Sequence, residues 1–230
     1  MLFKSVVTCA TIVGLLVDWV SAQNLNGNVS MDFRQGASSR LKPIYMGEKI
    51  TYDPVMGMRI RIDGPKQAPT LQSDFYLNYG RVEVVAQAAP GKGIISAYDL
   101  LSDVKDEIDV EWVGADNNRV QSNYFYRGDT TTWGRGAFHD VNRATSSFHR
   151  YTIDWNRDRL LWLIDGQVVR TLTPGAPEGY PDTPSVLKVG SWISGDPDNS
   201  EGTIGWGGGL ADFSQAPFDF YVQSIYVEAY

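Results

Sequence analysis

Short stretches of alternating apolar and polar residues recur along the chain, a pattern typical of β-strands with one buried face. Residues 81–84 read Arg-Val-Glu-Val, residues 108–112 read Ile-Asp-Val-Glu-Trp, and residues 151–155 read Tyr-Thr-Ile-Asp-Trp. Residues 218–227 form another strand-like stretch near the C-terminus. We therefore predict a strand over each of these four stretches.

A β-hairpin is predicted over residues 160–170. The apolar run Leu160–Ile164 and the strand-like stretch Gln167–Arg170 are separated by Asp165 and Gly166. An Asp-Gly pair tolerates the positive φ angles of a type I′ turn, the turn that best joins two adjacent antiparallel strands.

The rest of the pattern favours one all-β domain. Glycine and proline recur between the strand-like stretches, for example at residues 90–91, 174–175 and 207–209, and indicate turns. No helix of three turns and no internal repeat is evident in the sequence. No linker separates two halves of different composition, and 43% hydrophobic residues suffice for a substantial core. We expect a single β-sandwich domain over residues 23–230.

The first 22 residues are predicted to be a secretory signal peptide. Lys4 precedes an apolar run from Val6 to Val17, and Val20–Ala22 offers the small residues that a signal peptidase recognises. The alternative is a membrane anchor, but Asp18 ends the run after about 12 residues, where a bilayer span needs about 20. We expect cleavage after Ala22, secretion, and no membrane span.

Secretion sets further expectations for the mature chain. The only cysteine of the full sequence, Cys9, lies in the predicted signal. The mature domain would therefore have no disulfides and must be held together by its core. Asn28 begins an Asn-Val-Ser sequon and is a candidate glycosylation site. Residues 221–230 lack the hydrophobic tail that directs lipid anchoring, so we expect a freely secreted or non-covalently retained protein.

Net charge excludes one class of partner. With 20 basic and 27 acidic residues the formal charge is −7, which argues against binding nucleic acid, whose phosphates require a basic face. No nucleotide, haem or metal signature is present, so we expect no cofactor and no metal. We expect a monomer.

The candidate chemistry concentrates in residues 106–114, which read DEIDVEWVG. Glu107, Asp109 and Glu111 fall on one face of the predicted strand, while the apolar residues between them fall on the other. Three carboxylates about 7 Å apart repel one another, and no basic residue alternates with them. Crowded like charges shift pKa values apart, which makes this face a candidate catalytic site.

Paired carboxyl groups at such spacing are typical of glycosidases. A retaining enzyme places a nucleophile and an acid/base about 5 to 5.5 Å apart, and an inverting enzyme about 6.5 to 9.5 Å apart. Side chains leaning over a concave sheet could bring Glu107 and Glu111 together, with Asp109 between them. The spacing alone leaves both mechanisms open, as well as a solvated strand face or a calcium-binding edge.

The motif DEIDVEWVG resembles the active-site strand of glycoside hydrolase family 16. Further segments resemble its fungal branch, the CRH-type cell-wall transglycosylases that join chitin to β-glucan, most specifically GSW…GDP followed by GTI-x-W. These segments span residues 75–103, 121–136, 148–172 and 190–225. The resemblance implies a concanavalin-like β-jelly roll of two curved antiparallel sheets, with a glycan cleft on the concave sheet.

By this resemblance, Glu107 is the nucleophile, Glu111 the acid/base and Asp109 the helper between them. The implied activity is a retaining transglycosylase that cleaves a β-1,4-linked chitin donor and transfers it to a β-glucan or chitin acceptor. Its substrates, and hence its partners, are polysaccharides. The alternatives are a β-glucan endohydrolase of the same fold and a non-catalytic lectin-like module.

Other residues are candidates for substrate binding. Asn123 and Phe125 share one face of the next predicted strand, and Arg127 could bind sugar hydroxyls or pair with Asp129. Trp133 lies in a loop rich in glycine and threonine. Trp192 and Trp206 are sugar platforms by the resemblance. Each tryptophan could instead pack in the core, as we expect for Trp155 and Trp162.

Overall fold

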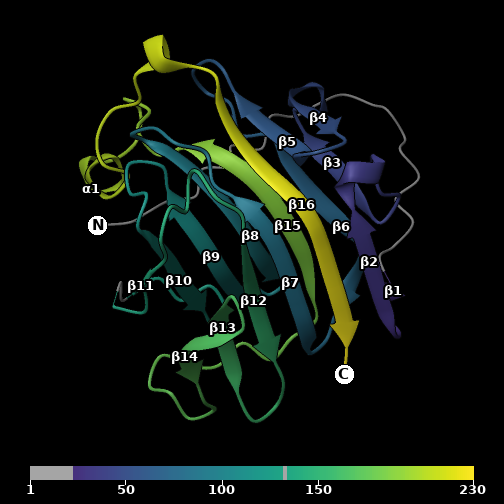
Figure 1. Ribbon diagram of the computed structural model, residues 1–230. Helices are drawn as coiled ribbons and strands as arrows, with labels where there is room; N and C mark the ends of the chain where they lie inside the picture. Colours follow the sequence, from purple (N-terminus) through teal and green to yellow (C-terminus); the bar gives the residue numbers. More distant parts are fainter. Residues whose placement is uncertain (1–22, 132–133) are drawn as a thin grey trace, which may run out of the picture.

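Two curved β-sheets packed face to face make up the computed structural model, which describes residues 23–131 and 134–230 (Figure 1). The predicted signal peptide, residues 1–22, lies outside these described residues. Strand β1 pairs with β6 in parallel, and the other pairs described below are antiparallel. The all-β sandwich predicted from the sequence is confirmed.

One sheet, which we call the inner sheet, follows the order β1-β6-β15-β8-β9-β10-β11, with β3 paired to β6. Its strands are β1 (Gln23–Asn24), β3 (Leu41–Tyr45), β6 (Thr70–Leu77), β8 (Ile94–Ser102), β9 (Glu107–Val113), β10 (Arg119–Phe125), β11 (Ala137–Asp140) and β15 (Ser185–Ile193).

The other sheet, the outer sheet, follows the order β14-β13-β12-β7-β16-β5-β4, with β2 paired to β16. Its strands are β2 (Asn28–Asp32), β4 (Ile50–Asp53), β5 (Gly57–Ile62), β7 (Gly80–Gln87), β12 (His149–Trp155), β13 (Leu160–Ile164), β14 (Gln167–Leu172) and β16 (Phe218–Ala229). Short helices connect the strands: η1 (Phe33–Gln35), η2 (Gly47–Lys49), α1 (Glu201–Trp206) and η3 (Phe213–Gln215).

The predicted strands and hairpin are confirmed. In β7, for example, burial alternates strictly along the strand, because every second side chain enters the core. Between β13 and β14, Asp165 has φ 49° and Gly166 has φ 85°, the positive values expected for this turn.

The core lies between the sheets and contains many large aromatic rings. Trp112 on the inner sheet meets Tyr151 on the outer sheet edge to face, with ring centroids 4.6 Å apart. Trp155 and Trp162 are buried, as predicted. The indole Nε1–H of Trp162 donates a hydrogen bond to the carbonyl oxygen of Asp109 at 3.1 Å, which ties the acidic strand to the opposite sheet.

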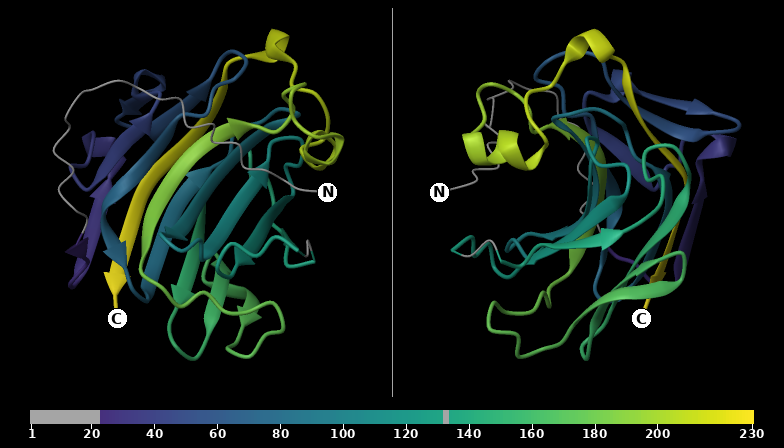
Figure 2. Two further views of the ribbon diagram at one scale, coloured as in Figure 1. Left: turned by 180° about the vertical axis from the view of Figure 1, so that it is seen from behind. Right: turned by 60° about the vertical axis from the view of Figure 1, so that its left-hand side comes forward.

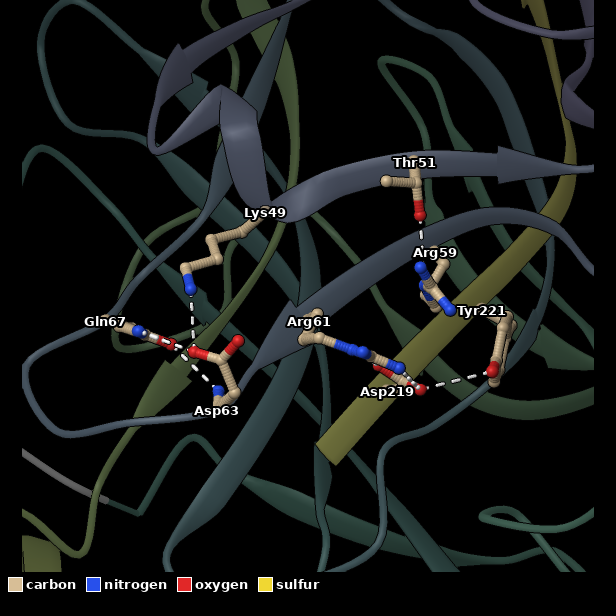
Figure 3. A network of polar contacts seen from close by, with 8 residues as sticks. All are labelled: Lys49, Thr51, Arg59, Arg61, Asp63, Gln67, Asp219 and Tyr221. Atoms are coloured by element: carbon tan, nitrogen blue, oxygen red, sulfur yellow. Dashed lines mark hydrogen bonds and ion pairs between the residues drawn. The ribbon is translucent and has the colours of Figure 1, made fainter. Parts of the chain in front are cut away.

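The solvent-facing side of the outer sheet carries paired charges. Arg61 on β5 makes two hydrogen bonds of 2.7 Å to the carboxylate of Asp219 on β16, and Tyr221 donates to the same carboxylate (Figure 3). Lys49 lies 2.7 Å from Asp63 in the same region. Asp219 and Asp63 are therefore matched with bases or donors from neighbouring segments.

Both sheets bend, so the inner sheet has a hollow face (Figure 2). The right-hand view shows α1 on one side of this hollow and the β10–β11 region on the other. Within the residues that the structure describes, no helix is long and apolar enough to cross a bilayer.

Candidate active site

The three predicted acids lie on one face of β9 and line a single cavity. Glu107 and Glu111 are half-buried and Asp109 is buried, while Ile108, Val110 and Trp112 of the same strand enter the core, as the alternation requires. The cavity has a volume of about 190 Å³. It is lined by Thr70, Ala97, Asp99, Glu107, Asp109, Glu111, Lys188, Gly190, Ser191 and Trp192.

Strand register explains why these residues meet. Ala97 on β8 lies opposite Glu111, and Gly190 on β15 lies opposite Ala97, so small residues flank Glu111 on that side. Gly190 is required here, because a Cβ atom would lie 2.8 Å from the carbonyl oxygen of Pro69. Small side chains therefore leave open space beside the acid.

The two glutamates have different electrostatic environments. Burial and the nearby Glu107 raise the pKa of Glu111 to about 7. Burial also raises the pKa of Glu107, but a hydrogen bond from Asp109 and the charge of Lys188 oppose that rise. The rise in the pKa of Glu107 is therefore partly offset by its neighbours, whereas the rise in the pKa of Glu111 is not.

A fourth acid, Asp99 on β8, completes the cluster and was missed in the sequence. Asp99 lies opposite Asp109 on β9 and opposite Lys188 on β15. Burial, then the nearby Glu107, raises its pKa well above the usual range. The pKa of Asp109 is also raised well above its usual value, first by burial and then by the nearby Glu107, Glu111 and Asp99. In the sequence Asp99 stands between Tyr98 and Leu100, and only the pairing of β8 with β9 reveals its neighbours.

Two of the predicted sugar platforms meet at one side of the cavity. The rings of Trp192 on β15 and Trp206 on α1 stack with centroids 5.9 Å apart and planes 19° apart. Trp206 donates its indole N–H to Gln121 Oε1 at 3.0 Å, and Gln121 lies opposite Glu111. The end of α1 is therefore fixed to the strand beside the acids.

Close glycine packing holds α1 in place. The N–H of Gly93 donates to the carbonyl of Gly207 at 2.8 Å, and Gly195 donates to the carbonyl of Gly93 at 3.0 Å. A Cβ atom on Gly207 would lie 1.8 Å from Ser194 Oγ. The glycines around α1 thus allow the backbone contacts that set the position of Trp206.

Asn123 and Phe125 lie on the inner sheet beside the acids. Asn123 is opposite Asp109 and Phe125 is opposite Glu107, so both share the face of the acids, as predicted. The Asn123 Oδ1 atom accepts a hydrogen bond from the backbone N–H of Tyr124. Neither residue is among the cavity-lining residues named above, and their roles in binding stay predictions.

Arg127 has different partners from the one considered in the sequence. Its guanidinium donates to Asp182 at 2.9 Å and lies 3.8 Å from Asp106, whereas Asp129 binds Arg135. The expected alternative, a pair with Asp129, is therefore wrong, because the chain turns at Arg127 with φ 51° and directs the side chain elsewhere. Arg127 is also absent from the cavity lining.

The structure bears differently on the two remaining candidate residues, Trp133 and Asn28. Trp133 lies outside the described residues, so its place relative to the cleft stays a prediction. Asn28 lies on β2 and is exposed, which leaves its amide accessible. Across residues 23–131 and 134–230, no group of three or more His, Cys, Asp or Glu side chains is arranged to hold a metal ion.

Comparison with known proteins adds to this geometry. Residues 37–208 match the family described as Glycosyl hydrolases family 16. The chain is 50% identical over 162 residues to Congo red hypersensitive protein 1 of Saccharomyces cerevisiae, covering 70% of this chain and 32% of that protein. It is 44% identical over 207 residues to Crh-like protein 4 of Aspergillus fumigatus, covering 90% of this chain and 45% of that protein.

Solved structures agree with these matches. The structure titled "Crh5 transglycosylase in complex with NAG" superposes with a TM-score of 0.85 at 41% identity, covering 91% of this chain and 86% of that chain. A Bacillus licheniformis β-glucanase superposes with a TM-score of 0.72 at 22% identity, covering 89% of this chain and 99% of that chain, and shares the fold. The chain spans about a third to a half of the length of the two curated relatives. It belongs to glycosyl hydrolase family 16 and, within that family, to the Crh-like proteins.

Proposed function

We propose that this protein is a retaining transglycosylase that remodels the fungal cell wall. It cleaves a β-1,4-linked chitin donor and transfers the cleaved chain to a β-glucan or chitin acceptor. The similarity to the Crh5 transglycosylase supports the reaction class. The observation that carries the proposal is the unequal environment of Glu107 and Glu111 within one cavity.

The different environments of Glu107 and Glu111 fit a double-displacement mechanism, in which one acid donates a proton and the other attacks the sugar. Glu111, with a pKa of about 7, holds a proton that it donates to the glycosidic oxygen. Glu107, supported by Asp109 and Lys188, attacks the anomeric carbon as an anion and forms a glycosyl ester. Glu111, now deprotonated, removes the proton from the incoming acceptor hydroxyl, which displaces Glu107 from the sugar.

The cleft also offers a path for a polymer. One cross-strand row passes through Gly190, Ala97, Glu111, Gln121 and Phe138 in the register of the inner sheet. Neighbouring strands lie about 4.8 Å apart, close to the length of one sugar unit. A glycan that crosses the strands along this row would place one of its linkages beside Glu111, with the stacked tryptophans next to it.

The direct test is a transfer assay. The protein is incubated with chitin oligomers and a fluorescent β-1,3-glucan acceptor, and the labelled products are separated by size. Labelled products longer than the acceptor are the expected result. Short reducing sugars without labelled products would instead identify a β-glucan or chitin hydrolase, and binding without turnover would identify a lectin-like module.

We also infer secretion to the extracellular space or the cell wall. The predicted signal over residues 1–22 and the similarity to Crh-like proteins support this location. Mass spectrometry of protein expressed in yeast should find an N-terminus at Gln23 and a glycan on Asn28. Size-exclusion chromatography with light scattering should give the mass of a monomer.

A further inference from the structure

Asp106 is a buried acid that stands directly before Glu107, and the proposed reaction gives it no role. Its side chain is fully buried. One carboxylate oxygen, Oδ1, accepts a hydrogen bond from the backbone N–H of Arg127 at 2.9 Å. The other, Oδ2, accepts from the backbone N–H of Asp182 at 3.0 Å and from the hydroxyl group of Thr183. Removing a carboxylate from water is costly, and these three donors compensate for that cost.

The backbone of Asp106 makes further contacts. Its N–H donates to Ser102 Oγ at 2.8 Å, and its carbonyl oxygen accepts from the N–H of Ser102 at 2.9 Å. Ser102 is the last residue of β8, Arg127 comes after β10, and Thr183 comes before β15. Asp106 therefore joins the ends of these three strands to the start of β9. Strands β8, β9 and β15 supply every cavity-lining residue named above except Thr70.

Two residues beside this carboxylate have backbone conformations that side chains disfavour. Lys105, directly before Asp106, has φ 67°, and Arg127 has φ 51°. Neither is glycine, so each lies in the left-handed region at a steric cost. The two turns also contact each other, because the N–H of Gly128 donates to the carbonyl oxygen of Lys105 at 2.8 Å. Such conformations persist where surrounding contacts fix them, and the hydrogen bonds of Asp106 are contacts of this kind.

The position of Glu107 shows what this arrangement achieves. Glu107 is the first residue of β9, with Leu101 opposite it on β8 and Phe125 opposite it on β10. Glu111 lies further inside β9, where paired residues continue on both sides of it along the strand. The end of a strand opens more readily than its interior, so a reacting group at the end needs another support. Asp106 supplies that support one residue away.

We propose that Asp106 is a positioning residue for Glu107, because its carboxylate fixes the start of β9 against the neighbouring strand ends. Displacement of a reacting group by about 1 Å can slow a reaction about 100-fold. This effect on turnover rests on the proposed role of Glu107 as nucleophile. The hydrogen bonds that hold the strand end do not depend on the reaction.

Hydrogen–deuterium exchange tests the support of β9 without any substrate. Asp106→Asn keeps the size of the side chain but replaces one acceptor oxygen with an NH2 group, which then faces a donor. Exchange of segments 103–109 and 126–129 should become about tenfold faster, because hydrogen bonds to a charged acceptor are lost. Asp165→Asn is the matched control. Asp165 also accepts a backbone N–H, from Arg150 at 2.8 Å, but lies on the β13–β14 turn of the outer sheet. This control should leave the exchange of both segments unchanged.

Steady-state kinetics tests the positioning role. Measured well below the unfolding temperature of each variant, Asp106→Asn should reduce kcat about 10- to 100-fold with little change in KM. Thr183→Val removes one donor to the carboxylate and keeps the shape of the side chain, so it should reduce kcat by less. Asp165→Asn should keep the wild-type kcat even if its unfolding temperature falls as far. A merely structural role would give the two aspartate variants the same kcat.

The outcomes are distinct. Wild-type kcat in a folded Asp106→Asn protein, or equal losses in Asp106→Asn and Asp165→Asn, would overturn the positioning role. Unchanged exchange of segment 103–109 would show that the carboxylate does not hold the strand end. If Asp106→Asn does not fold, Thr183→Val carries both measurements, and wild-type exchange and turnover in that variant would overturn the proposal. Wild-type protein without any turnover would refute the role of Glu107 and its positioning, while faster exchange in the variant would still support the hold on β9.

Discussion

Acidic residues occupy two contrasting settings on the two sheets. On the outer sheet, Asp219 receives two hydrogen bonds from Arg61 across neighbouring strands. On the inner sheet, Glu107, Asp109 and Glu111 share one cavity with Asp99. Lys188 lines the same cavity, and its charge opposes the rise in the pKa of Glu107.

The difference teaches what each group of acids does. Paired charges lower the energy of the folded state, whereas crowded and partly buried acids raise it and move their pKa values toward neutrality. The outer acids therefore contribute to stability and the inner acids to chemistry.

Removal of an inner acid should affect turnover more than any other change. Glu107→Gln should reduce kcat by a factor on the order of 10³ or more, because the glycosyl ester can no longer form. Its thermal stability should not decrease, since the change relieves repulsion. Asp219→Asn on the outer sheet should show the reverse: normal kcat with reduced stability. A Glu107→Gln enzyme with wild-type turnover would eliminate the proposed nucleophile.

The pH dependence of the wild-type enzyme should reflect Glu111. The value of kcat/KM should decrease about tenfold per pH unit above about 7, as Glu111 loses the proton that it must donate. Initial rates of transfer to a labelled acceptor between pH 4 and 9 measure this limb. A profile that stays flat up to pH 9 would show that Glu111 is not the acid.

The raised pKa of Glu111 also predicts how the stability of the folded protein depends on pH. Glu111 is protonated more readily in the folded state, with a pKa of about 7, than in the unfolded state, with an ordinary value of 4.5. The folded state therefore loses stability as pH rises from about 4.5 to about 7. Glu111→Gln should be more stable than wild type by about 1–3 kcal/mol at pH 8 and equal to it at pH 4. Calorimetric unfolding at both pH values tests this, and an equal difference at pH 4 and 8 would contradict it.

The partly buried ion pair between Arg61 and Asp219 should contribute more to stability than an exposed ion pair. Asp219→Ala should lower the free energy of unfolding by about 1–2 kcal/mol, because the half-buried Arg61 loses two charge-assisted hydrogen bonds. Asp198→Ala removes the partner of Lys66 in a pair with about three-quarters of each side chain exposed, and should leave stability nearly unchanged. Denaturant titration compares the two variants; equal losses would refute the role assigned to burial.

The smallest effect on catalysis is expected at the stacked pair of Trp192 and Trp206. Trp206→Phe removes the N–H group that donates to Gln121 but keeps an aromatic ring against Trp192. Loss of one hydrogen bond of about 1 kcal/mol should raise KM about fivefold and leave kcat nearly constant. Trp206→Ala should raise KM further. If Trp206→Phe instead reduced kcat with KM unchanged, the tryptophan would act on the reacting groups rather than on binding.

Local signals in the sequence were sufficient for several elements. Alternation placed Glu107, Asp109 and Glu111 on one face of a strand, and the structure has them on one face of β9. The Asp-Gly pair predicted the turn at Asp165 with its positive φ angles. These features depend on neighbours two to four residues away, so the order of residues alone specifies them.

Tertiary structure decided which distant residues surround the acids. Asp99 and Lys188 enter the cavity because β8 and β15 pair next to β9, and Arg127 leaves it because a turn directs the side chain toward Asp182. In β8, the apolar Ile95 and Leu101 lie on the same face as Asp99, which obscures the alternation that would have marked this strand as half-exposed. The sequence by itself determined which side chains share a face, since strand geometry repeats every two residues. Only the folded sheet determined which strands lie side by side, because that choice depends on core packing summed over the whole chain.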